Sequence, residues 1–339
     1  MKSWRIFWKM SGKRGLVFAG AGALCILSVI LSLCMGAASL SLGEIGQALW
    51  QGPQSGAGYI LWYARVPRTL GSLLAGAALA VSGAVIQGVL GNRLASPGVI
   101  GVNAGAGLMV TVVCALGALS GWSIAVSAFA GAMISVLLVT LAAEKAGASR
   151  TTVILGGVAI NSLLNALSEA IGVLVPDAAM LSGDFRIGGF ASVAYERMLP
   201  AGALILLALT ALFLMLNELD VLMLGEETAH GLGLPVRRMR MVFLILAAML
   251  AGAAVSFAGL LGFVGLIVPH MARRLVGNES RYLLPLCAVG GAGLVTLCDL
   301  LSRVLFAPYE LPVGILMAVL GGPFFIVLLL RRKGGAQDA

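Results

Sequence analysis

The sequence predicts an all-α polytopic membrane protein with about ten transmembrane helices. Of its 339 residues, 60% are hydrophobic and only 11% are charged, whereas soluble domains have about 45–50% apolar and about 25% charged residues. A spanning helix needs about 20 apolar residues. The long apolar runs lack the alternation of a transmembrane β-strand, so they favour helices. The whole chain, residues 1–339, is expected to form one transmembrane domain.

Ten apolar runs define the expected spans. They cover residues 16–38, 70–90, 99–119, 124–143, 152–173, 199–216, 241–258, 260–275, 283–305 and 312–330. Glycine and proline interrupt the eighth run. Residues 39–63 are mixed in polarity and rich in tryptophan and tyrosine, which is typical of an interfacial segment. Residues 175–194 predict a short amphipathic helix at the surface.

The basic residues predict the orientation of the chain. Five arginines fall on the outer side, and the other 17 of the 22 lysines and arginines fall on the cytoplasmic side if both termini are cytoplasmic. The outer ones are Arg65, Arg68, Arg186, Arg197 and Arg303. This bias follows the positive-inside rule and favours an even number of spans. It also accounts for the net charge of +8 without a nucleic-acid partner.

A polar stretch at residues 217–240, NELDVLMLGEETAHGLGLPVRRMR, interrupts the apolar sequence on the cytoplasmic side of this topology. Glu226 and Glu227 suit the first turn of a short helix, because carboxylates interact favourably with the positive end of the helix dipole. An apolar ridge is formed by Leu222, Leu224, Ala229 and Leu232. The stretch fits either a surface presented to a partner protein or an ordinary interfacial loop helix. Its arginines, Arg237, Arg238 and Arg240, are interpreted as anchors for the following span.

Signatures of catalysis and metal binding are absent from the sequence. It has no GxxxxGK[ST] phosphate loop and no HExxH motif, and its two histidines are far apart. We therefore predict no catalytic residue, no metal site and no cofactor. Within the spans, Asp299 and Arg303 are four residues apart and are interpreted as a structural ion pair in preference to a proton relay. The energy for transport is accordingly expected to come from another subunit.

Six motifs support a family resemblance. They are RVPRTL at 65–70, GAALAVSGAVIQG at 76–88, NRLASPGVIGV at 92–102, LGEETAHGLG at 224–233, GFVGLIVPH at 262–270 and ELPVG at 310–314. Together and in this order they resemble the FecCD family, the permease subunits of ABC importers for iron-siderophores, haem and vitamin B12. The resemblance extends over about residues 15–333.

The resemblance implies a fold like that of the vitamin B12 permease, with ten spans in the bacterial plasma membrane. It further implies a homodimer or a pair of related permeases, two cytoplasmic ATPase subunits and an extracytoplasmic substrate-binding protein. The expected cargo is an iron(III)-siderophore, with vitamin B12 or haem as alternatives. An ion-coupled secondary transporter is the alternative from another class.

The resemblance also implies roles for individual residues. The helix that couples the permease to the ATPase corresponds to Leu224, Gly225, Glu226, Glu227, Ala229, Leu232 and Gly233. The arginines that dock the binding protein correspond to Arg65, Arg68 and Arg303, although interfacial snorkelling also accounts for the first two. The pathway or gate corresponds to Thr151, Thr152, Asn161 and Asn165, although hydrogen bonds between helices account equally well for the asparagines. Arg150 departs from the family pattern, because a small polar gate residue is usual there.

Overall fold

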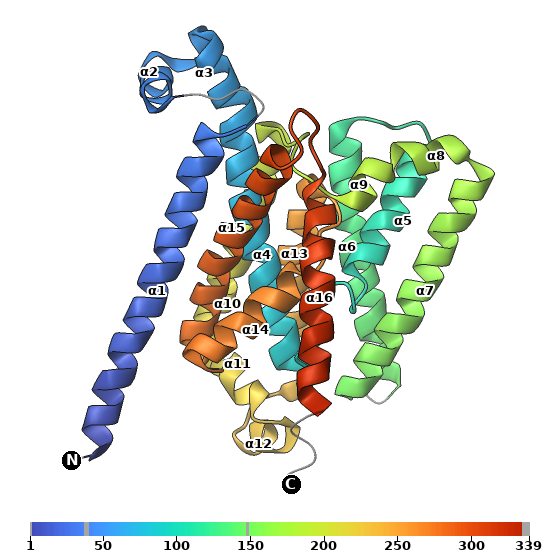
Figure 1. The fold of residues 1–339 in the computed structure, drawn as a ribbon. Helices are drawn as coiled ribbons and strands as arrows, with labels where there is room; N and C mark the ends of the chain where they lie inside the picture. Colours follow the sequence, from blue (N-terminus) through green and yellow to red (C-terminus); the bar gives the residue numbers. More distant parts are fainter. Residues whose placement is uncertain (1, 37–40, 147–148, 334–339) are drawn as a thin grey trace.

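Helix α4 (Val66–Leu90) lies at the centre of a bundle of helices, where it packs against α15 (Ser280–Val304), α13 (Val236–Ala258), α14 (Val264–Val276) and α10 (Tyr195–Leu214) (Figure 1). The structure is a computed structural model that describes residues 2–36, 41–146 and 149–333. Most residues of α4 are buried. Its position makes α4 the scaffold for polar contacts at both ends of the bundle.

The remaining long helices surround this centre. They are α1 (Lys2–Cys34), α5 (Val102–Ala115), α6 (Gly121–Lys145), α7 (Arg150–Leu174) and α16 (Val313–Lys333). Helix α1 packs mainly on α15, and α7 packs on α5 and α6 at the opposite edge of the bundle (Figure 1). Within the described side chains, few residues of α1 and α7 are buried. Short helices complete the chain: α2 (Leu42–Gln51), α3 (Gly56–Ile60), α8 (Pro176–Leu181), α9 (Gly183–Ile187), α11 (Leu216–Met223) and α12 (Glu226–Gly231).

The expected all-α membrane fold is confirmed. Within the described residues, seven helices are long and apolar enough to cross a membrane, and α5 and α16 are shorter apolar helices. Together with α14, they occupy the positions of the ten expected spans. The expected surface segment at 175–194 contains α8 and α9. The expected end of the first span at residue 38 lies outside the described residues.

The helix that contains the second span is longer than the sequence predicted. Residues Gly56–Leu90 form one helical stretch of 35 residues, and the placement of residues 39–63 in an interfacial segment stays a prediction. Within this stretch, residues Leu61–Arg65 form a π-helical turn immediately before α4. Pro67 follows in the first turn of α4. Proline has no backbone N–H to donate to the preceding turn, and the helix continues through Pro67 directly after the π-helical turn.

Helix α14 crosses only part of a bilayer. Its 13 residues span about 20 Å at 1.5 Å per residue, against a hydrocarbon core of about 30 Å. Non-helical residues 259–263 precede it, and backbone groups around this break find partners within the protein. Phe185 accepts a hydrogen bond from the Leu260 N–H at 2.9 Å, and the Ala258 carbonyl accepts one from the Gly189 N–H at 2.8 Å. The glycines and proline of the eighth run mark this broken helix.

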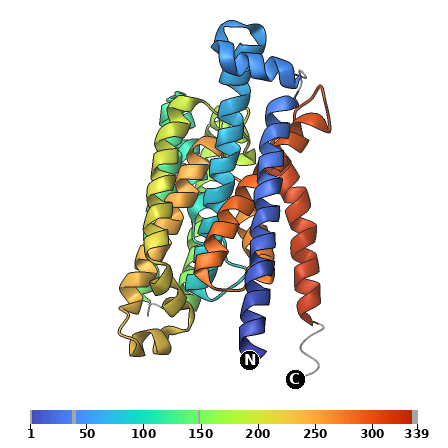
Figure 2. The ribbon, with the colours of Figure 1, turned by 90° about the vertical axis from the view of Figure 1, so that its left-hand side faces the viewer.

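Both ends of the described chain lie at the same end of the bundle. Helix α1 begins and α16 ends at the end that carries α12, while α2 and α3 lie at the opposite end (Figures 1 and 2). This arrangement agrees with an even number of spans. Which end faces the cytoplasm stays a prediction. The side chains of Lys2, Arg5, Lys9, Arg331, Arg332 and Lys333, which entered the charge count, lie outside the described part of the chain.

Glycine contacts set the spacing between α4 and its neighbours. A Cβ added to Gly76 would collide with the carbonyl of Gly291 on α15, and a Cβ added to Gly291 would collide with the carbonyl of Gly76. In lipid, helices associate largely through such close backbone packing. The α4–α15 crossing therefore has no room for a larger residue on either side.

We expect Gly76→Val to lower the stability of the protein by about 1–3 kcal/mol, the usual cost of overpacking a close-packed interior. The measurement is the apparent Tm of the detergent-solubilised protein. Gly20→Val on α1 is the matched control, because no atom lies within 4 Å of a Cβ added there. Equal Tm values for the two variants would contradict a tight α4–α15 crossing.

Candidate functional site

The short helix α12 projects from one end of the bundle (Figure 1). Glycines flank it: Gly225 has φ +112° and Gly233 has φ +82°, a region that L side chains rarely adopt. Leu224 and Leu232 are each 63% exposed, and Glu227 is also exposed. These three residues form the outward ridge of α12. Such exposed leucines on a polar projection are typical of a protein contact.

Two of the residues expected in the coupling helix contact the bundle. The side chain of Ala229 is fully buried, so it anchors α12 to the bundle. Glu226 forms an ion pair with Arg240 in the second turn of α13, and its Oε1 lies 3.9 Å from Nε of Arg150 at the start of α7. Arg240 is buried. It pairs with Glu226, and its role as an anchor for the span stays a prediction.

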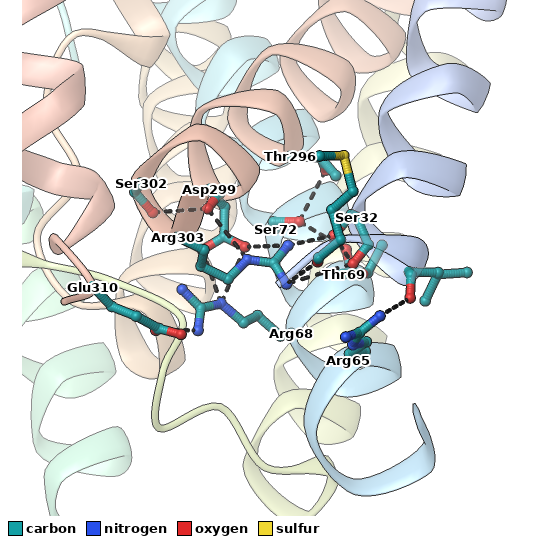
Figure 3. A network of polar contacts seen from close by, with 12 residues as sticks. Ser32, Arg65, Arg68, Thr69, Ser72, Thr296, Asp299, Ser302, Arg303 and Glu310 are labelled. Carbon is teal, nitrogen blue, oxygen red and sulfur yellow. Dashed lines mark hydrogen bonds and ion pairs between the residues drawn. The ribbon is translucent and has the colours of Figure 1, made fainter. Parts of the chain in front are cut away.

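A network of buried charges occupies the opposite end of the bundle (Figure 3). Asp299 on α15 is fully buried. Its Oδ1 accepts a hydrogen bond from Nε of Arg68 at 3.0 Å, and its Oδ2 lies 3.2 Å from Nη2 of Arg303. The expected structural pair of Asp299 and Arg303 is confirmed, and Arg68 on α4 is its third member.

Hydrogen bonds extend this network to α1. The Arg303 guanidinium donates to Oγ of Ser32 at 2.7 Å, and Ser32 bonds Oγ1 of Thr69 on α4 at 2.8 Å. Arg65 donates to the backbone carbonyl of Leu33. Arg65 and Arg303 are each only 4% exposed. A buried charge is costly unless it is paired, and these contacts supply the partners.

Arg68 reaches the surface at this end. Its Nη1 lies 2.7 Å from Oε2 of Glu310, in the loop between α15 and α16. Beside this pair is a cavity of about 480 Å³. Charged residues in its lining are Arg68, Asp184, Arg197 and Glu310, and aromatic ones are Phe185, Phe190 and Phe257. Of the three arginines expected to dock a partner, Arg68 alone lines this cavity.

The four residues expected in a pathway or gate lie along α7 but in different surroundings. Thr151 and Asn165 are exposed. The backbone N–H of Thr152 donates to Oγ of Ser149 at 3.1 Å, which caps the start of the helix. Asn161 donates to the Gly98 carbonyl at 2.7 Å, so it holds the loop between α4 and α5. Their role in a pathway stays a prediction.

Sequence reasoning missed the partners of several residues. Arg150 was noted for its departure from a family pattern, but its contact with Glu226 was not foreseen. Glu310 lies within the ELPVG motif at 310–314, yet its contact with Arg68 joins residues 242 positions apart. A charged residue inside an apolar sequence signals that a partner exists. It does not identify that partner.

The comparisons with known proteins agree with this geometry. A family described as the FecCD transport family matches residues 24–331. The hemin transport system permease protein HmuU of Yersinia pestis is 40% identical, with 92% of this chain and 95% of that protein covered. The vitamin B12 import system permease protein BtuC of Shigella boydii is 37% identical, with coverage of 91% and 93%. The Fe(3+)-citrate import system permease protein YfmD of Bacillus subtilis is 34% identical, with coverage of 96% and 97%.

The fold also matches a solved structure. A structure described as an inward-facing conformation of a metal-chelate type ABC transporter superimposes with a TM-score of 0.83 at 30% sequence identity. The match covers 94% of this chain and 99% of that one. The arrangement of helices is therefore that of a transporter permease throughout the matched region.

We expect Asp299→Ala to reduce stability by about 3–5 kcal/mol, because it leaves buried cations without their partner. Asp299→Asn retains oxygen and size, so its effect is expected to be smaller. Glu310→Gln is the control at the exposed edge of the same network, with a change of less than about 1 kcal/mol. Apparent Tm in detergent checks all three, and an Asp299→Ala value equal to that of Glu310→Gln would contradict the central place of Asp299.

Proposed function

Since this chain belongs to the FecCD transport family, we propose that it is the permease subunit of an ABC importer that carries an iron(III)-siderophore inward, driven by ATP hydrolysis in separate subunits. It is a multi-pass permease of the kind found in the bacterial inner membrane. The observation that carries the proposal is the exposed ridge of α12 at one end of the bundle. A helical bundle that lacks an ATP site of its own needs such a contact to receive energy.

The ATPase subunits bind at α12. In this proposal all 339 residues form one transmembrane domain, and residues 217–240 are its coupling loop. Leu224, Glu227 and Leu232 make the contact, while Gly225 and Gly233 set the turns at its edges. Ala229 and Glu226 join the helix to the bundle, so that a movement of the ATPase reaches the membrane. In the same proposal both termini are cytoplasmic, which is supported by the start of α1 and the end of α16 lying at the end of the bundle that carries α12.

The substrate-binding protein docks at the opposite end, where Arg68 is the accessible member of the group with Arg65 and Arg303. An acidic side chain of the binding protein competes with Glu310 for the outer edge of the Arg68 guanidinium. Arg65 and Arg303 support this site from within, through Leu33 and Asp299. Paired charges across such an interface favour correct orientation and fast association more than affinity.

A second copy of the chain completes the pathway. Helix α7 leaves a long face exposed, with Leu155, Val158 and Leu163 beside the polar Thr151 and Asn165. Two such faces across a dimer axis would enclose a route in which Thr151, Thr152, Asn161 and Asn165 line the wall or gate. A related permease in place of the second copy would give the same arrangement.

The cargo is tested by uptake into proteoliposomes that contain the permease, its ATPase and its binding protein. We expect ATP-dependent uptake of a ferric siderophore. Haem is the second candidate, because a hemin permease is 40% identical to this chain, and vitamin B12 is the third, because a vitamin B12 permease is 37% identical. Uptake of haem or vitamin B12 alone would contradict the siderophore proposal. Gradient-driven uptake by the permease without its ATPase would contradict the ABC importer itself.

The ridge of α12 gives a sharp test of the ATPase contact. We expect Leu224→Asp with Leu232→Asp to lower ATP-driven uptake at least tenfold, since charged groups would replace the apolar contact. Co-purification of the ATPase should fall in parallel. Trp50→Asp on α2 is the control, because this residue is exposed at the opposite end. Normal ATPase capture by the leucine variant would reject α12 as the contact.

The docking proposal predicts opposite effects of two substitutions. Arg68→Gln should weaken association of the binding protein, and Glu310→Gln should strengthen it by removing an internal competitor. Both effects should shrink as salt rises, because exposed charges are screened. Surface plasmon resonance at low and high salt provides the measurement. Unchanged or parallel effects of the two variants would count against docking at Arg68.

A further inference from the structure

Arg150, at the start of α7, lies at a position that its own helix does not favour. A cation near a helix N-terminus opposes the positive end of the dipole, and α7 has no acidic residue in its first turn to offset it. The side chain instead turns to the C-terminal ends of two other helices. Its Nη2 donates to the carbonyl of Leu222 in the last turn of α11 at 3.0 Å. Nη1 lies against Gly91, the C-cap of α4.

These contacts suit a guanidinium. The last carbonyls of a helix lack partners within the helix and carry a partial negative charge. The contacts of the Arg150 guanidinium with these two helix ends therefore offset its unfavourable interaction with the dipole of α7. It is placed for tertiary contact, because nothing in its local sequence stabilises it there.

The same side chain faces α12. Nε of Arg150 is buried and has no hydrogen-bond partner, and the nearest carboxylate oxygen, Oε1 of Glu226, lies 3.9 Å away. That distance allows an ion pair but exceeds hydrogen-bond length. A small shift of α12 toward α7 would close the gap and satisfy the donor. A shift away would break the pair.

Glu226 contacts α13 and α7, two helices that differ in how much of their surface is buried. Oε1 also pairs with Arg240 of α13, a helix buried along most of its length, whereas α7 is mostly exposed. In the part of the chain that the structure describes, no other hydrogen bond or ion pair joins α7 to α11 or α12. Movement of α12 can therefore reach α7 through Arg150 while α13 serves as the fixed side.

We propose that Arg150 is a positioning residue that transmits displacement of α12 to the start of α7, through Glu226 and the Leu222 carbonyl. The proposal rests on the proposed function, because it assumes that an ATPase moves α12. It assigns to Arg150 a role that a small polar residue at this position could not perform. Thr151 and Thr152 follow directly, so a shift of Arg150 moves the expected gate residues with it.

The test compares Arg150→Ala with Arg281→Ala in the full complex with its ATPase and binding protein. Arg281 is a suitable control, because it is an exposed arginine outside residues 217–240 that pairs with Glu279, and its neighbour Ser280 bonds Asp220 of α11 at the same end of the bundle. We expect Arg150→Ala to keep ATPase capture and ATP hydrolysis but to raise the ATP consumed per cargo at least fivefold. Arg281→Ala should leave this ratio unchanged. Arg150→Lys should restore part of the coupling, since it keeps the charge.

Two further measurements separate transmission from a merely structural role. Spin labels at position 155 of α7 and position 228 of α12 should report an ATP-dependent change in distance that Arg150→Ala abolishes. Glu226→Gln should raise the ATP consumed per cargo, and its combination with Arg150→Ala should cost no more than the larger single effect, because the two residues act in series. If the complex with Arg150→Ala does not assemble, the test uses Arg150→Lys and Glu226→Gln.

The outcomes distinguish this inference from the proposed function. If the wild-type complex shows no ATP-driven uptake, the proposed function fails. If the wild type transports and the α12 ridge variant loses ATPase capture, while Arg150→Ala keeps the wild-type ratio of ATP to cargo, the inference about Arg150 fails and the proposed function stands. The inference about Arg150 would also fail if the effects of Glu226→Gln and Arg150→Ala on the ATP consumed per cargo multiplied in the double variant, because independent residues would behave in that way.

Discussion

Close contact between helix backbones at glycine holds α4 in the centre of this protein. Lipid chains are as apolar as leucine side chains, so helices in a membrane gain little from hydrophobic burial and depend on packing. The reciprocal contact of Gly76 with Gly291 brings α4 against α15, and Gly83 brings it against Gly265 at the start of α14. Hydroxyl pairs fit between the same helices, such as Ser72 with Thr296 at 2.9 Å. The polar networks at the two ends rest on this fixed spacing.

The buried charges depend on that spacing because each one is stable only beside a partner. At the end that carries α2 and α3, Asp299 of α15 pairs with Arg68 of α4 and with Arg303 of its own helix. Toward the other end, Arg273 of α14 contacts Gln87 and the Ala84 carbonyl of α4, the latter at 3.1 Å. These pairs fix the register of α4 against its neighbours. A buried charge without a partner lowers the stability of the fold, which also accounts for the small number of charged residues in the sequence.

Differences in packing divide the molecule into a firm centre and a freer edge. Helices α4, α13 and α15 are largely buried, whereas α1 and α7 are largely exposed. Within this arrangement α12 meets the centre through Ala229 and Arg240, and it meets α7 through Arg150. The proposed mechanism assigns the fixed part to the buried helices and the moving part to α7, and the charged contacts of Glu226 lie between them.

The sequence by itself determined the membrane fold, the positions of ten apolar helices and the polar segment at 217–240, because these depend on local hydrophobicity, glycine, proline and charge. It also predicted the pair of Asp299 with Arg303, since residues four apart share a face of one helix. The tertiary structure alone decided that the helix containing the second span begins at Gly56, that Ala229 is buried, and that Arg68 shares Asp299. It also decided that Arg150 turns toward Leu222 and Glu226. These contacts join residues up to 231 positions apart. The local sequence does not identify which distant side chain pairs with a buried charge.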